Sequence, residues 1–193
     1  MIDRPPCRCC GANAVHVRLG VASEINVAAE LSVALGAAPE RDWRRPWIVL
    51  QHELARLREP RTGELSGVET HAALQDLQSF FIHAYHLKDS LKAASPAVGI
   101  SKDEIEAAIT ADPDLALLAD LANLDKHAVL DRPPRSGDVP VVVSLRAIRA
   151  GSGEGGWRLE ALIKHNGKTH DGLAVAGAVV GAWNRHLAGW DLI

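Results

Sequence analysis

Residues 80–92 read FFIHAYHLKDSLK and lie inside a long segment whose apolar side chains recur at the period of an α-helix. This segment runs from Gly67 to Ala94, and its apolar positions form a single stripe. The stripe consists of Ala73, Leu77, Phe80, Ala84, Leu87 and Leu91. A stripe of this length predicts a helix that packs one face into the core, and we expect the rest of the fold to assemble on it.

Similar periodicity predicts helices at residues 21–38, 44–59, 101–110 and 113–130. Breaking and capping residues separate these segments. The Ser95–Gly99 segment, which contains Pro96, is expected to end the central helix, and Ser101 with Glu104 has the spacing of a capping box. The pair Pro133-Pro134 cannot continue a helix, so it closes the helical region.

After this point the apolar period changes from helical to alternating, which is typical of strands. Strands are predicted at 139–149, 157–165 and 168–171, with Asn166-Gly167 as a type I′ turn, and a last helix at 172–187. The predicted fold is mainly α: an up-and-down helical bundle with a small antiparallel β-meander, residues 139–171, before the C-terminal helix. Residues 1–20 lack a clear period, so we expect an irregular N-terminal segment followed by a single domain at 21–193.

The composition excludes some classes of protein. A chain of 193 residues is long enough to bury a conventional core, and its net charge of −3 provides no overall basic field for nucleic acid. Its three cysteines, Cys7, Cys9 and Cys10, are too crowded to build a disulfide framework, which favours a reducing compartment. Their spacing matches no common zinc motif. No apolar run is long enough to cross a bilayer, so we expect a cytoplasmic protein without membrane contact.

Two groups of polar side chains border apolar helical faces. On a helical projection His83, His86 and Ser90 form one strip, with Lys88 nearby on the same helix. A second group, Asp120, Asn123 and His127, borders the apolar face of the 113–130 helix, next to Lys126. If the two helices pack through their apolar faces, both borders are expected to meet in one cleft. A simpler interpretation makes the histidines hydrogen-bonded edge residues and the lysines solvated surface charges.

The segment at residues 122–127, Ala-Asn-Leu-Asp-Lys-His, resembles the signature of the HEPN superfamily of helical domains. In that signature an Arg is followed by a polar residue and, a few positions later, by a His. Asn123 and His127 occupy the matching positions, whereas Ala122 stands where the Arg would be. The resemblance covers roughly residues 20–130.

The resemblance implies a dimeric helical bundle, whose active members cleave RNA without metal. His127 would then transfer the proton and Asn123 would orient it, with Asp120 and Lys126 beside them. Because Ala122 supplies no charge to the phosphate, Lys126 or Lys88 could replace the Arg only in part. The expected function is therefore binding of RNA or of a protein partner, with weak or absent metal-independent ribonuclease activity and no cofactor.

A metal centre is the alternative. His83, His86, Asp120 and His127 offer the imidazole and carboxylate ligands that bind iron or zinc between helices, as in an oxidase or hydrolase. A third interpretation is a non-catalytic structural interaction module. We also expect a homodimer, because five Trp occur in a chain with only 4% aromatic residues and because Ala174, Gly177, Ala178 and Gly181 give the last helix a small-residue face.

Overall fold

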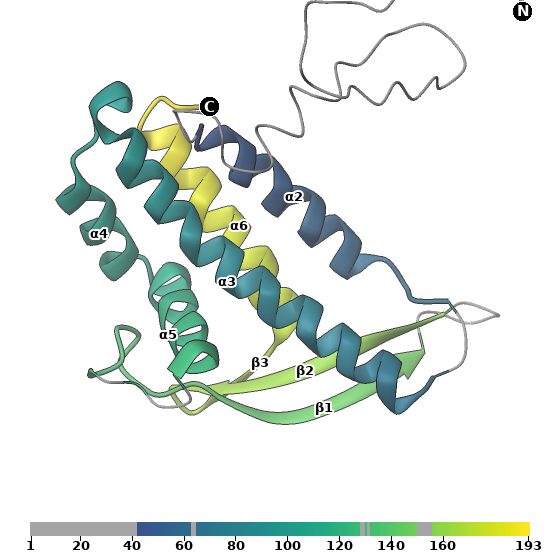
Figure 1. The fold of residues 1–193 in the computed structure, drawn as a ribbon. Coiled ribbons are helices and arrows are strands. Elements are labelled where there is room, and N and C mark those ends of the chain that lie inside the picture. The colour runs from purple at the N-terminus through teal and green to yellow at the C-terminus, as the bar shows by residue number, and fades with distance from the viewer. Residues whose placement is uncertain (1–41, 63–64, 128–129, 131, 150–155) are drawn as a thin grey trace, which may run out of the picture. The chain divides into compact units, whose positions relative to one another are not determined.

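The structure is a computed structural model, and it describes residues 42–62, 65–127, 130, 132–149 and 156–193. The predicted irregular segment 1–20, with its three cysteines, and the predicted helix 21–38 lie outside these residues. Residues 42–193 group into one unit, whose described part contains five helices and one antiparallel sheet (Figure 1).

The elements follow the order expected from the sequence. The helices are α2 (Arg44–Arg58), α3 (Gly67–Val98), α4 (Lys102–Ala111), α5 (Pro113–His127) and α6 (Gly172–Gly189), and the strands are β1 (Val141–Arg149), β2 (Trp157–His165) and β3 (Lys168–Asp171). A mainly helical fold with a three-stranded antiparallel sheet before the last helix is confirmed. The up-and-down arrangement of the helices stays a prediction. Within the described residues, no helix combines the length and apolar character needed to span a membrane.

The long helix α3 begins and ends at residues that satisfy its terminal backbone groups. At its start the Ser66 hydroxyl accepts a hydrogen bond from the Glu69 backbone N–H. The predicted break at Ser95–Gly99 is wrong, because α3 continues through Pro96 to Val98. Pro96 lies in the last turn, where its missing N–H removes a single helical bond. Gly99, with a φ of 74°, then ends the helix in the left-handed conformation that glycine favours.

The sheet has the order β1-β2-β3, and its turns use the expected residues. Asn166 and Gly167 both have positive φ angles, 49° and 73°, as a type I′ turn between β2 and β3 requires. The loop after α2 joins the sheet through a two-bond bridge between Arg61 and Trp157. At Gly156 a Cβ atom would lie 1.8 Å from the Arg61 carbonyl oxygen, so only glycine permits this approach.

The core lies where α3 packs against α2, α5 and α6, with β2 also in contact with α3 and α6 (Figure 1). Inside the core a polar contact joins α6 to α3: the buried Trp183 indole N–H donates to the Ala84 carbonyl oxygen at 3.0 Å. Four of the five tryptophans are buried in this unit, namely Trp43, Trp47, Trp157 and Trp183. Trp190 packs against the core. The expectation that the tryptophans mark a dimer interface is therefore wrong, because they fill the core of one chain.

The small residues of α6 also serve contacts within the chain. Gly172 is buried, and a Cβ there would lie 2.9 Å from Leu77 on α3. At Gly177 a Cβ would lie 2.9 Å from the Arg58 guanidinium on α2. Of the four residues predicted to form a small-residue face, Gly177 thus lies against α2, whereas Ala174 is exposed and Ala178 and Gly181 are half-buried. The homodimer stays a prediction.

Candidate anion-binding site

Three basic side chains from different parts of the chain surround one carboxylate, that of Glu106 on α4. Lys92 of α3 contacts its Oε1 atom, and Lys88 of α3 lies 3.5 Å from the same oxygen. Arg135, in the segment after α5, places its Nη2 atom 2.8 Å from Oε2. Among the described residues Glu106 supplies the single carboxylate that these cations share, so there they outnumber it by two charges. We call Lys88, Lys92, Glu106 and Arg135 the basic cluster.

Lys88 is held in the basic cluster by Tyr85, one helical turn earlier on α3. Its Nζ atom lies 2.6 Å from the Tyr85 hydroxyl oxygen and 3.8 Å from the centre of the phenol ring. Only 12% of the Lys88 side chain is exposed. The interpretation of Lys88 as a solvated surface charge is therefore wrong, because most of its side chain is covered and its ammonium group contacts Tyr85.

The two acidic groups of this region titrate below their ordinary ranges. Burial alone would raise the pKa of Glu106, but hydrogen bonds from Lys92 and Arg135 outweigh it and lower this pKa to about 2. Burial also raises the pKa of Tyr85. The hydrogen bond from Lys88 and its charge outweigh burial and lower this pKa overall, and Arg135 and Arg132 add smaller lowering effects. Both shifts are responses to excess positive charge.

Asp120, a predicted catalytic or metal-binding residue, holds Arg135 in place. Its buried carboxylate accepts hydrogen bonds from the backbone N–H groups of Arg135 and Ser136, at 3.0 and 2.8 Å, and from the Ser136 hydroxyl at 2.6 Å. Three donors occupy most of its acceptor capacity. The structure thus gives Asp120 a positioning role: it fixes the segment that carries Arg135 onto α5.

Ser136 also connects α5 to the sheet, because His165 Nε2 on β2 lies 2.8 Å from its hydroxyl oxygen. The order Asp120–Ser136–His165 differs from that of a hydrolytic triad, in which the His lies between the carboxylate and the hydroxyl and takes the proton from the hydroxyl. Here the hydroxyl donates to the carboxylate, so this chain of contacts does not activate a nucleophile. It joins α5, the 135–136 segment and β2.

The histidines of the predicted strip, His83 and His86, contact different partners. His83 Nδ1 lies 2.8 Å from Glu53 on α2, and His86 Nδ1 lies 2.8 Å from Asp89 on its own helix. Both histidines are exposed, rather than at the edge of the core. Asp120 faces the 135–136 segment instead, so the structure does not bring these three predicted metal ligands together. The described residues contain no group of three or more His, Cys, Asp or Glu side chains that could hold a metal ion.

The remaining predicted site residues lie near the end of α5 or on α3. Asn123 is half-buried, and its amide nitrogen has no hydrogen-bond partner among the described residues. The side chains of Lys126 and His127 lie outside the described part of the structure, although both residues belong to α5. Ser90 is half-buried on α3. The predicted roles of Asn123, Lys126 and His127 stay predictions.

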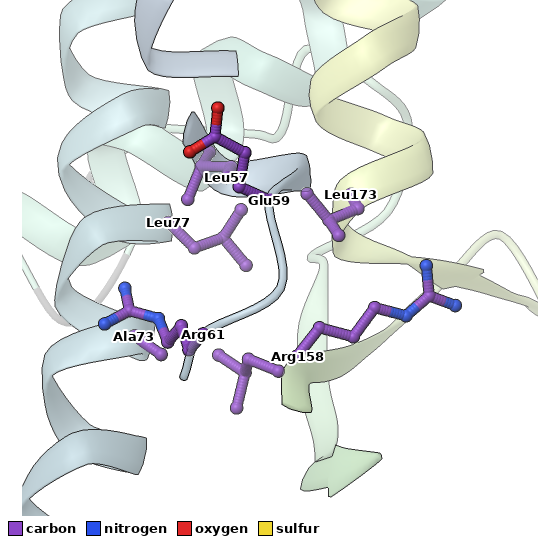
Figure 2. Close-up of a pocket in the computed structure, with 8 residues that line it drawn as sticks. Leu57, Glu59, Arg61, Ala73, Leu77, Arg158 and Leu173 are labelled. Carbon is purple, nitrogen blue, oxygen red and sulfur yellow. The ribbon is translucent and has the colours of Figure 1, made fainter. Parts of the chain in front are cut away.

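Two hollows lie elsewhere, near the bridge between Arg61 and Trp157. The first is lined by apolar residues of α2, α3, β2 and α6 together with Glu59, Arg61 and Arg158, and has a volume of about 20 Å³, room for about one water molecule. Figure 2 shows the guanidinium groups of Arg61 and Arg158 pointing away from each other at this hollow. The second, between Arg56 and Asp76, has a volume of about 210 Å³. Both are smaller than the roughly 300 Å³ at which small-molecule pockets begin.

Glu106, Arg135 and Tyr85 were absent from the residues proposed from the sequence. One pattern in the sequence indicates part of this site. Tyr85, Lys88 and Lys92 are spaced three and four residues apart, so they share one face of α3. That face borders the buried Leu87 and Leu91. A lysine at this border is partly covered by whatever packs on the helix.

Comparison of the chain with protein-family models, with curated proteins and with solved structures gives no match. The resemblance of residues 122–127 to the HEPN signature therefore stays a prediction, and the candidate site depends on its own geometry.

Proposed function

We propose that this chain binds RNA through its phosphates, with the basic cluster as the contact. The observation that supports this is the excess charge at Glu106, where three cations share one carboxylate. Confining like charges at half-buried positions is unfavourable unless an anion joins them. A phosphate group would accept the hydrogen bonds that these cations do not give to Glu106.

The donors suit a phosphate. Arg135 directs one terminal nitrogen at Glu106 and the other at the Thr110 hydroxyl, 3.5 Å away, so its other N–H donors are the ones that can meet an anion. Lys88 has three N–H donors, of which the Tyr85 hydroxyl accepts one. The other partner of the Lys88 ammonium group among the described residues is Glu106 Oε1, at the long distance of 3.5 Å. The cluster thus keeps capacity for an incoming anion while Glu106 holds its geometry without one.

The position of the cluster agrees with the proposed HEPN likeness. Arg135 follows α5, on which Asn123 and His127 lie, and Asp120 of the same helix fixes the Arg135 backbone. In this proposal Arg135 supplies part of the charge that Ala122 lacks. The chain is then an RNA-binding relative of that superfamily, with weak or absent cleavage.

Fluorescence anisotropy with a labelled single-stranded RNA of about 20 nucleotides tests the proposal. At 50 mM KCl we expect a Kd in the range of about 1–100 μM, typical of phosphate-dominated binding. Changing Lys88 and Lys92 together to Gln should weaken binding about tenfold or more, since each lost phosphate contact lowers affinity at all sequences. The matched control is Lys164→Gln on β2, which removes one exposed charge and should leave binding within about twofold.

Two outcomes would overturn the proposal: RNA binding equal in the double variant and the control, or displacement of the RNA by polyglutamate at equal charge concentration, which would favour an acidic protein partner.

A gel assay with EDTA, run in parallel, tests for cleavage of the RNA. Cleavage that survives EDTA and is lost in His127→Ala would add nuclease activity, whereas intact RNA is the expected result.

A further inference from the structure

The outer strand of the sheet, β1, presents apolar side chains to solvent along its first half. Val141, Val142 and Val143 are each about half exposed, and Leu145 is 42% exposed. The pairing register with β2 shifts between Val142 and Ser144, and the side chains on both sides of this shift are exposed. Figure 1 shows β1 as the outer strand, and in the described part of the chain its extensive contacts are with β2 alone.

A strand of this kind is unusual at a sheet edge. Natural edge strands are commonly short, charged or covered, because an unpaired row of N–H and C=O groups accepts another strand. Here β1 has nine residues, and between Val141 and Leu145 it carries no charge. Its outer edge pairs with no described strand. Backbone groups that no described strand pairs with, together with exposed apolar side chains, predict addition of a strand from outside.

The residues of β1 favour a second copy of the same strand in antiparallel orientation. We propose that two chains pair through β1 around a two-fold axis near Ser144, which would join both sheets into one of six strands. This pairing places Val143 opposite the second copy's Leu145, and Val142 opposite the second copy's Arg146. It therefore covers apolar side chains with apolar atoms from the partner.

The charges at the two ends of the strand agree with this orientation. Asp138 precedes β1, and Arg149 ends it. Antiparallel pairing brings each Asp138 next to the second copy's Arg149, whereas parallel pairing would place like charges side by side. The remaining cation, Arg146, is already paired with Glu160 on β2, so it does not repel its counterpart near the axis.

Sedimentation equilibrium of the full chain tests the interface. At 20–50 μM we expect a dimer, and we expect Val143→Lys to give a monomer with unchanged circular dichroism. The matched control is Val68→Lys, an equally drastic change at the start of α3, where the side chain is 78% exposed. This control should remain a dimer. A monomeric wild type, or a Val143→Lys protein that still dimerises, would overturn the proposal.

Disulfide trapping tests the register. In a chain whose Cys7, Cys9 and Cys10 are changed to Ser, Ser144→Cys should form a covalent dimer on mild oxidation, because its Cα atoms lie within disulfide reach across the axis. In the same background Arg149→Cys should stay monomeric on denaturing gels, since the two copies of residue 149 would lie roughly 30 Å apart along the strand. The opposite pattern would contradict the proposed register.

Discussion

The Nζ atom of Lys88 lies 2.6 Å from the hydroxyl oxygen of Tyr85 and 3.8 Å from the centre of its ring. The same ammonium group therefore donates to the phenol and rests on its π face, which fixes a largely buried lysine at the surface of α3. This pair determines where the charge of the basic cluster is presented.

Tyr85 is the only tyrosine of the chain, so its ionisation can be followed directly by absorbance near 295 nm. We expect a titration midpoint below that of free tyrosine, since the lowered pKa reflects Lys88. In Lys88→Met the midpoint should rise, because burial then dominates. Lys102→Met, a change at an exposed lysine, should leave it unchanged, and a wild-type midpoint equal to that of free tyrosine would show that Lys88 does not stabilise the phenolate.

Glu106→Gln should change stability and RNA affinity in opposite directions. Loss of the carboxylate leaves three cations without a counter-charge, so the free energy of unfolding at pH 7 should fall by about 1–3 kcal/mol in urea denaturation. RNA affinity should rise severalfold, because the variant has lost the anion that competes with phosphate. Glu59→Gln, at an exposed carboxylate, is the control for both measurements.

The stability difference should depend on pH in one direction. The folded-state pKa of Glu106, about 2, lies below its ordinary value of 4.5, so its contribution is fully present above pH 4.5. It is lost as the pH falls from 4.5 through about 2, because the carboxylate of the folded state then becomes protonated as well. Wild type and Glu106→Gln should therefore converge in stability at low pH. A difference that stays constant from pH 7 to pH 2.5 would attribute the effect to packing instead of charge.

Much of the fold could be predicted from the sequence, because helix periodicity, caps and the Asn166-Gly167 turn are local signals. Pro96 misled the prediction, since in a last turn a proline costs only one hydrogen bond. The tryptophans misled it for a different reason: composition does not reveal whether a large side chain fills the core or an interface.

The candidate site was less predictable. Lys88 was proposed from the sequence, but its partners Glu106 and Arg135 come from α4 and from the segment after α5. Their meeting depends on tertiary packing, which no local pattern in the sequence encodes. The sequence places Asp120 on the border of an apolar helical face, but helical spacing does not indicate its partners, which are two backbone N–H groups and a hydroxyl.

Asp120→Asn tests the positioning role. The amide has one acceptor in place of two, so the hydrogen bonds from Ser136 lose their partner, and we expect the free energy of unfolding to fall by about 2–3 kcal/mol. RNA binding by the folded fraction should also weaken, because the loss of the Ser136 bonds loosens the 135–136 segment that carries Arg135. Asp103→Asn, on the exposed first turn of α4, should cost less than about 1 kcal/mol. Equal effects of the two variants would contradict this role.

Gly156→Ala tests the junction between α2 and the sheet. The added Cβ would overlap the Arg61 carbonyl group, so the bridge to Trp157 must shift, and thermal denaturation should show a loss of about 1–3 kcal/mol. Gly67→Ala is the matched control, because nothing lies within 4 Å of its Cβ position and alanine favours a helix. A stable Gly156→Ala protein would mean that this bridge contributes little.

The most direct test of the central claim, that Lys88 and Lys92 contact phosphates, is the salt dependence of RNA binding. The slope of log Kobs against log[KCl] for single-stranded RNA changes by about 0.7 for each phosphate that a cation neutralises. We predict that changing Lys88 and Lys92 together to Gln makes this slope less steep by about 1.4, while Lys164→Gln leaves it unchanged. An identical slope in the wild type and in the double variant would contradict the account.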